Sequence, residues 1–156
     1  MRAANIWHRI KFENPYLTHG AQLSDFLEKN LSDAIRGCMV VVAAIEGSGD
    51  PVRGLTLLDC ALITIAELHA RLLATEQIDW GDFYFVKESG EALRQKLREK
   101  ATIQNAISES HLALRVIDDS SIEVFTTDHN LISTLSALHL SAQIESASLA
   151  EMDYPQ

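Results

Sequence analysis

The sequence predicts a single α/β or α+β domain whose elements follow the order βαβαβαββα. Short apolar runs typical of strands alternate along the chain with apolar stripes at helical spacing. A length of 156 residues fits one domain, and 47% hydrophobic and 22% charged residues are typical of a packed globular protein. Strand–helix–strand units favour parallel pairing, and a C-terminal hairpin adds an antiparallel edge, so we expect a mixed sheet.

The first elements follow from alternation and from helical spacing. Residues 5–12 alternate apolar and polar side chains, which predicts a strand. The apolar stripe from Leu23 to Ile35 predicts a helix, with Thr18 as its N-cap and Gly37 in the left-handed conformation after its end. The run 38–45 is rich in valine and predicts a strand that is covered on both faces.

The middle of the chain predicts two helices and a strand. Asp50 and Pro51 are typical of a helix start, and residues 55–74 are apolar on nearly every helical face. Because one small domain can cover only part of such a helix, we expect a homodimer. Residues 83–87 predict a strand, and the apolar stripe over 93–107 predicts another helix.

The last third predicts a hairpin, a helix and a tail. Two alternating runs within 111–127 flank four turn-forming residues, 118–121. Thr127 or Asp128 would then cap the final helix. We expect the domain to cover residues 1–147 and residues 148–156 to form a loose C-terminal tail.

The predicted order of elements is also found in thioredoxin-like domains. The redox chemistry of those domains is excluded, because the chain has no C-x-x-C motif and no proline before the hairpin. The two cysteines, Cys38 and Cys60, both lie in apolar surroundings, so we expect free thiols.

The stretch DWGDFYFV, residues 79–86, places four of the ten aromatic residues within six positions. It is loosely similar to the base-stacking strand of RNA-recognition domains, but the residue before Gly81 is Trp80 instead of a basic residue. Alternation instead predicts a central strand with Phe83 and Phe85 on one face and Tyr84 and Val86 on the other. We expect Trp80 and Asp82 to be partly exposed at the entrance of this strand.

The net charge of −9 is concentrated in the last third of the chain. Residues 111–156 carry seven carboxylates and a single basic side chain, Arg115. Such a field repels nucleic acids and anionic lipids and attracts basic partners. The longest apolar run, 38–45, is too short to span a membrane, and the N-terminus has no secretory pattern. We therefore expect a cytoplasmic protein without nucleic-acid or membrane partners.

We expect a non-catalytic interaction module that binds a basic protein, as inhibitors, immunity proteins and escort proteins do. Aromatic residues are frequent anchors at the centres of interfaces, so we include two of them. The predicted partner-binding residues are Asp118, Asp119, Glu123, Asp128, Trp80 and Tyr84.

The alternative is a small enzyme with a cleft at the strand ends. Its candidate residues are Ser48, Asp50 and Asp82, or the paired carboxylates Asp118 and Asp119. The six histidines show no metal-ligand spacing, and no nucleotide-binding or nucleophile motif is present. We therefore expect no metal, no cofactor and no catalytic residue.

Overall fold

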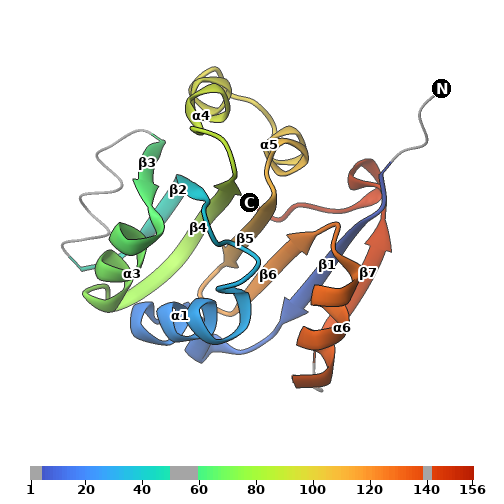
Figure 1. The fold of residues 1–156 in the computed structure, drawn as a ribbon. Helices are drawn as coiled ribbons and strands as arrows, with labels where there is room; N and C mark the ends of the chain where they lie inside the picture. The colour runs from blue at the N-terminus through green and yellow to red at the C-terminus, as the bar shows by residue number, and fades with distance from the viewer. Residues whose placement is uncertain (1–4, 50–59, 139–141) are drawn as a thin grey trace.

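A seven-stranded antiparallel sheet with the order β3-β2-β4-β5-β6-β1-β7 organises the α+β domain. The computed structural model describes residues 5–49, 60–138 and 142–156 (Figure 1). The described strands are β1 (Trp7–Phe12), β2 (Met39–Ser48), β3 (Ala61–Thr64), β4 (Gln77–Val86), β5 (Leu112–Ile117), β6 (Ser121–Thr126) and β7 (Gln143–Ala147).

The helices lie on both faces of this sheet. They are α1 (Gly20–Phe26), which continues as a π-helix over Leu27–Leu31, α3 (Ile65–Leu73), α4 (Glu91–Arg98), α5 (Ile103–Glu109) and α6 (His129–Leu138). Short 3₁₀ helices cover Pro15–Thr18 and Leu149–Glu151. In the described ranges, no helix has the length and the apolar content needed to cross a membrane.

Each face of the sheet has its own hydrophobic core. Helices α1, α3 and α6 pack on one face, over a core that includes Phe83 and Phe85. Helices α4 and α5 and the segment after β7 pack on the other, over a core that includes Tyr84 and Val86. The stretch 79–86 is therefore a central strand, as alternation predicted. Trp80 is half-buried, as expected. The expected exposure of Asp82 is wrong, because its side chain is buried on the face of the sheet that α4 and α5 cover.

The expected parallel pairing is wrong, because every strand pair in the described residues is antiparallel. The two strands joined by α3, β3 and β4, do run in the same direction. However, β2 lies between them and pairs with both in the opposite direction. In the same way β1 lies between β6 and β7. The thioredoxin-like topology is not confirmed.

The prediction of a single helix over 55–74 is also wrong for those of its residues that the structure describes. Residues Ala61–Thr64 form a strand that pairs with β2, and α3 begins only at Ile65. Thr64 ends the strand and caps the helix, because its Oγ1 accepts a hydrogen bond from the Glu67 amide at 3.1 Å. The expected helix start at Asp50 and Pro51, like residues 55–59, lies outside the described residues.

The helix expected over 93–107 is two helices. Lys100 has a φ of +63° between them, and the Thr102 hydroxyl caps α5 by accepting from the Asn105 amide. Thr18 does not cap α1, since it lies in the preceding 3₁₀ helix and His19 occupies the cap position. The predicted hairpin is confirmed as β5 and β6, and Gly37 has the predicted left-handed conformation with a φ of +77°.

Candidate functional site: an acidic edge beside a cavity

Asp118 and Asp119 occupy the exposed turn between β5 and β6, as the hairpin predicted. Both have a positive φ, 46° and 49°, a conformation that Asp tolerates better than most residues. The Asp119 amide donates a 2.8 Å hydrogen bond to the carbonyl of Asp79. This bond fixes the turn against the beginning of β4.

Further carboxylates gather at the same end of the sheet. Glu76 precedes β4 and is exposed, and Asp79 lies in the first part of β4. Glu46 lies near the end of β2, directly across from Trp80 of β4. No lysine or arginine occurs in the contributing segments 46–49, 76–81 and 117–121. We call this set the acidic edge: Glu46, Glu76, Asp79, Asp118 and Asp119.

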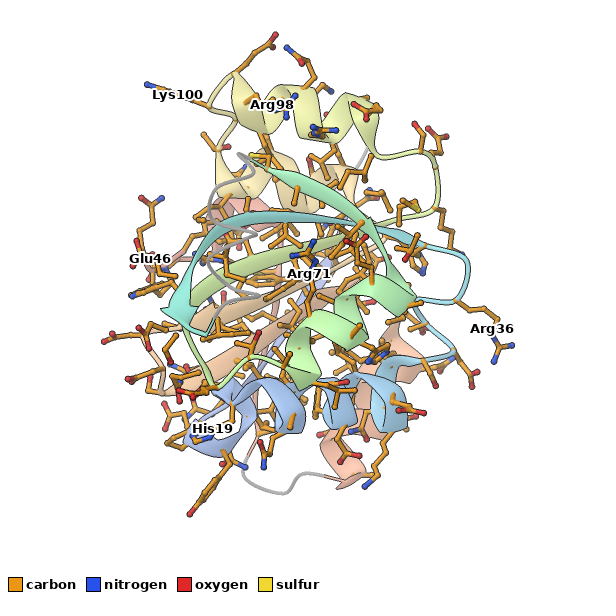
Figure 2. All side chains as sticks on the ribbon, turned by 90° about the vertical axis from the view of Figure 1, so that its left-hand side faces the viewer. His19, Arg36, Glu46, Arg71, Arg98 and Lys100 are labelled. Carbon is orange, nitrogen blue, oxygen red and sulfur yellow. The ribbon has the colours of Figure 1, made fainter. Side chains whose placement is uncertain are left out.

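Figure 2 shows Glu46 on one side of the molecule and Arg36 on the opposite side. The two remaining predicted carboxylates are not part of the acidic edge. Asp128 lies beyond the other end of β6, whose six residues span about 20 Å. Its Oδ1 accepts from the amides of Asn130 and Leu131, so it caps α6 as predicted.

Glu123 is buried on the face of the sheet that α4 and α5 cover. Its side chain is 3% exposed and forms an ion pair with Arg9 at 3.3 Å. Burial raises the pKa of Glu123, and the nearby positive charges of Arg9, Arg115 and Lys11 oppose that shift. The hairpin tip and the start of α6 are therefore not adjacent in space, because β6 separates them and turns Glu123 inward.

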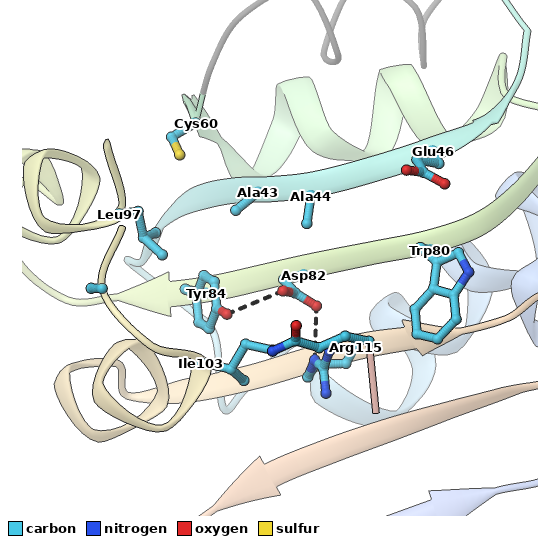
Figure 3. A pocket seen from close by; sticks show the side chains of 12 residues that line it. Ala43, Ala44, Glu46, Cys60, Trp80, Asp82, Tyr84, Leu97, Ile103 and Arg115 are labelled. Atoms are coloured by element: carbon cyan, nitrogen blue, oxygen red, sulfur yellow. Dashed lines mark hydrogen bonds and ion pairs between the residues drawn. The ribbon is translucent and has the colours of Figure 1, made fainter. Parts of the chain in front are cut away.

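A cavity of about 500 Å³ opens beside the acidic edge, above β2, β4 and β5 (Figure 3). Alanine, leucine and isoleucine side chains form most of its apolar wall, and α4, α5 and the segment between them close one side. Glu46 and Trp80 lie toward one end, and Cys60 and Leu97 lie toward the other. The lining residues are Ala43, Ala44, Glu46, Cys60, Trp80, Asp82, Tyr84, Leu97, Ala101, Ile103, Arg115 and Gln156.

Three buried polar side chains form part of the cavity lining. The Arg115 Nε donates to Asp82 Oδ1 at 2.8 Å, and the Tyr84 hydroxyl donates to Asp82 Oδ2 at 3.3 Å. Burial raises the pKa of Asp82, while the charge and the hydrogen bond of Arg115 lower it. Burial and the Asp82 charge raise the pKa of the Tyr84 phenol. Both oxygens of Asp82 are thus engaged within the protein.

A β-bulge in β2 turns Glu46 toward this cavity. Ala43 pairs with Asp82 and Glu46 with Trp80, so two residues of β2 lie opposite the single residue Gly81. Ala44 absorbs the extra residue with a φ of +51°. Strict alternation from Ala43 would place residue 45 on the cavity side. The bulge instead buries Ile45 in the opposite core and brings Glu46 to the cavity.

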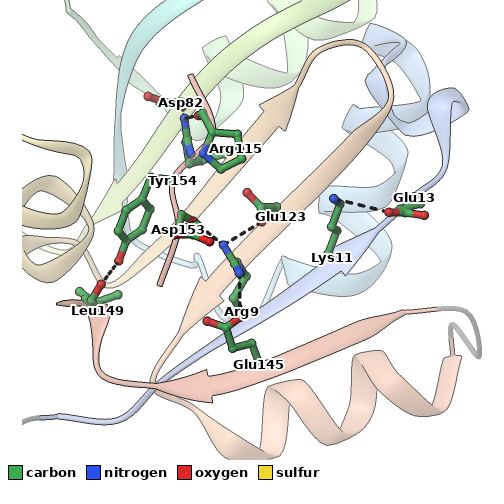
Figure 4. Close-up of polar contacts among 11 residues, drawn as sticks. Arg9, Lys11, Glu13, Asp82, Arg115, Glu123, Glu145, Leu149, Asp153 and Tyr154 are labelled. Atoms are coloured by element: carbon green, nitrogen blue, oxygen red, sulfur yellow. Dashed lines mark hydrogen bonds and ion pairs between the residues drawn. The ribbon is translucent and has the colours of Figure 1, made fainter. Parts of the chain in front are cut away.

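The Asp82–Arg115 pair belongs to a row of alternating charges that crosses the sheet (Figure 4). Arg115 lies across from Glu123, which pairs with Arg9, and Arg9 also contacts Glu145 of β7 at 2.8 Å. Because opposite charges on adjacent strands attract, this row pairs charges that would be costly to bury singly, although Arg115 Nη1 and Glu123 Oε1 form no hydrogen bond within the described residues. It joins β4, β5, β6, β1 and β7.

The C-terminal segment lies over this row. Arg9 donates to the Asp153 carbonyl at 2.5 Å, and Arg115 Nη2 donates to the Pro155 carbonyl at 2.7 Å. Tyr154 packs against Phe125, with ring centroids 6.1 Å apart. The segment thereby brings Gln156 to the cavity. Whether residues 148–156 are loose in solution stays a prediction.

The structure does not bring Ser48 and Asp82, two of the residues of the enzymatic alternative, together. Ser48 is exposed and lies across from Gln77, which is five residues, or about 17 Å, along β4 from Asp82. Asp50 lies outside the described residues. Cys38 and Cys60 form no disulfide, as expected. Within the described residues, no three histidine, cysteine or carboxylate side chains lie close enough to hold a metal ion.

Comparison with known proteins gives no match: no family model, curated protein or solved structure is significantly similar to this chain.

Proposed function

We propose that this protein is a non-catalytic interaction module that binds a basic protein through the acidic edge. The observation that carries the proposal is the gathering of five carboxylates from three separate segments at the end of the sheet where the half-buried Trp80 lies. Isolated surface carboxylates are ordinary. A group of them without an interspersed lysine or arginine creates a local negative potential, and such a potential attracts and orients a positively charged partner.

A half-buried aromatic side chain beside such a group adds a second property of binding surfaces. Tryptophan is enriched among the residues that contribute most to protein–protein affinity. Trp80 lines the cavity and lies across from Glu46 of the acidic edge. Trp80, Asp118 and Asp119 thus stay in the proposed interface, whereas Tyr84 and Glu123 are buried and Asp128 caps a helix elsewhere.

The side chains of the cavity favour this function over the enzymatic alternative. Asp82 would be its general acid or base, but both oxygens of Asp82 already accept hydrogen bonds from Arg115 and Tyr84. A general base must be free to reach the proton of a substrate. Asp82 and Arg115 instead form a buried pair that is suited to holding β4 against β5.

The proposed biological role is that of an inhibitor, an immunity protein or an escort in the cytoplasm. A strongly acidic protein that covers a basic surface would also block nucleic acid or other anions from reaching it. A homodimer is a further proposal. In the structure α3 buries Leu68 and Leu72 but leaves Leu73 64% exposed. Sedimentation at micromolar concentration tests for the dimer, and a single monomeric species would refute it.

The test of the interaction begins with affinity capture from the native host and mass spectrometry of the captured proteins. The leading candidate is then purified, and its dissociation constant is measured with two variants of equal net charge. Asp118→Lys with Asp119→Lys alters the acidic edge. Glu28→Lys with Glu88→Lys alters exposed carboxylates elsewhere on the molecule.

We expect the first variant to weaken binding about tenfold or more, because it places two positive charges against a basic partner. The control variant should change affinity by less than about threefold, since its charges lie farther from the interface and are screened. Equal losses in the two variants would show that only net charge matters. The acidic edge would then not be the interface.

A further inference from the structure

We infer that the cavity receives an arginine side chain of the basic partner, with the guanidinium between Trp80 and Glu46. This inference rests on the proposed function and assigns one contact within it. Its basis is the cavity of about 500 Å³ that opens beside the acidic edge and is lined by both of these residues.

The side chains of the cavity suit a long apolar stem that ends in a cation. Ala43, Ala44, Leu97, Ala101 and Ile103 provide apolar walls against which a methylene chain can pack. The charged lining groups are Glu46, Asp82 and Arg115. Since Asp82 and Arg115 neutralise each other, Glu46 remains as the unbalanced charge. An anionic ligand would meet that carboxylate, whereas a cation is attracted to it.

Glu46 is available to bind such a cation. Its side chain makes no ion pair with any residue in the described ranges, and it is exposed at the end of the cavity that Trp80 also lines. Directly paired residues on adjacent antiparallel strands hold their Cβ atoms about 5 Å apart. Glu46 and Trp80 are such a pair. A carboxylate and an indole therefore both lie at the same end of the cavity.

This combination favours arginine over lysine. The planar guanidinium can stack on an indole and donate two parallel hydrogen bonds to a carboxylate, whereas the ammonium of lysine is a compact and strongly hydrated charge. The bulge at Ala44 is the structural feature that makes the pair possible, because it shifts the alternation of β2 and turns Glu46 to this face.

The test uses n-butylguanidinium as the probe and n-butylurea as a neutral compound of similar shape. Each is titrated into ¹⁵N-labelled protein, and the two indole N–H resonances, from Trp7 and Trp80, are followed. Trp80→Phe assigns the Trp80 resonance by removing it. Trp7 is buried and serves as an internal reference. The titration is repeated with Glu46→Gln and with Glu28→Gln, which removes the same charge from an exposed residue outside the cavity.

We expect butylguanidinium to shift the Trp80 resonance in a saturable manner and butylurea to have little effect. Glu46→Gln should weaken probe binding about tenfold, as expected for loss of one charge-assisted hydrogen bond, and Glu28→Gln should not. Equal responses to the two compounds, or binding that is indifferent to Glu46→Gln, would overturn the inference.

The failure of this inference is distinguishable from the failure of the proposed function. If the probe binds as expected but charge reversal at Asp118 and Asp119 leaves partner affinity unchanged, the cavity site stands and the acidic edge as an interface is wrong. If the partner depends on the acidic edge but the probe does not bind at Trp80, the proposed function stands and the arginine site is wrong.

Discussion

Asp82 illustrates how a buried ionisable residue can serve structure without serving catalysis. It lies in the middle of β4, is 5% exposed and pairs with Arg115 on the neighbouring strand. One salt bridge and one phenolic hydrogen bond partly offset the cost of burying the carboxylate. The protonation of Asp82 is thereby linked to the stability of the sheet.

We predict that this linkage appears when Asp82→Asn is compared with the parent protein. Burial raises the pKa of Asp82 above its ordinary value of 3.8, so the folded state holds the proton more tightly than the unfolded state. Between the unfolded and folded pKa values, stability then falls as the pH rises. The unfolding free energy of the parent, measured relative to Asp82→Asn, should decline as the pH rises above about 4 and level off above the folded pKa.

Urea unfolding of both proteins at intervals between pH 4 and pH 8 measures this difference. Asparagine keeps the size of the side chain and an acceptor for Arg115, so the comparison isolates the titration. The prediction is contradicted if the unfolding free energy of the parent, relative to Asp82→Asn, instead increases as the pH rises. Such a result would show that Arg115 holds the pKa of Asp82 below its ordinary value.

Phe85 tests the assignment of β4 as a central strand. Its side chain is fully buried in the core under α1 and α3. We predict that Phe85→Ala lowers the unfolding free energy by about 3–5 kcal/mol in urea, as truncation of a buried aromatic ring does. Tyr16→Ala is the matched control, because Tyr16 is 71% exposed and should cost less than about 1 kcal/mol. Similar losses in both variants would contradict the core assignment.

At the scale of elements, sequence patterns predicted those strands and helices whose local signals are complete. Alternation located β1, β4 and the β5–β6 hairpin, and helical spacing located α1 and α6. The long apolar stretch 55–74 misled the interpretation, because an apolar run does not by itself distinguish a buried strand from a buried helix. Thr64 and Glu67 form a T-x-x-E pattern, which is a helix-start signal that would have separated β3 from α3.

The candidate site was harder to predict, because it depends on pairing between distant strands. The turn-forming sequence predicted the exposed position of Asp118 and Asp119. Glu76 and Asp79 join the candidate site only because β4 lies beside that turn in the fold. The position of the Glu46 side chain at the cavity depends on a β-bulge that the sequence of β2 does not predict. The Asp82–Arg115 pair requires the register between β4 and β5, which joins residues 33 positions apart.

The contribution of the Asp128 cap to the stability of α6 can be predicted. Its Oδ1 accepts from two amides at the start of α6. We expect Asp128→Ala to lower the unfolding free energy by about 1 kcal/mol, because the substitution leaves those amides without their side-chain acceptor. Asp128→Asn, which keeps the acceptor, should cost only a few tenths of a kcal/mol. Equal costs for the two substitutions in thermal or urea unfolding would show that the charge matters and the cap does not.

At the scale of the whole molecule, the sheet separates two kinds of environment. One face carries a continuous apolar core under α1, α3 and α6, which accounts for much of the buried surface. The other face combines a smaller core with the row of paired charges and the cavity. The five carboxylates of the acidic edge, which form no ion pair with another residue in the described ranges, lie at one end of the strands. Charge is thus paired in the buried row and left unpaired at an end of the sheet that a partner can reach.

The most direct test of the proposed function is the rate at which the protein associates with its purified partner, measured by stopped flow at low and high salt. Steering by the acidic edge predicts fast association that slows as the Debye length falls from about 10 Å at 0.1 M salt to about 3 Å at 1 M. Asp118→Lys with Asp119→Lys should slow association at low salt and flatten this dependence, while Glu28→Lys with Glu88→Lys should largely preserve it. An association rate that is indifferent both to salt and to the substitutions at Asp118 and Asp119 would contradict the account.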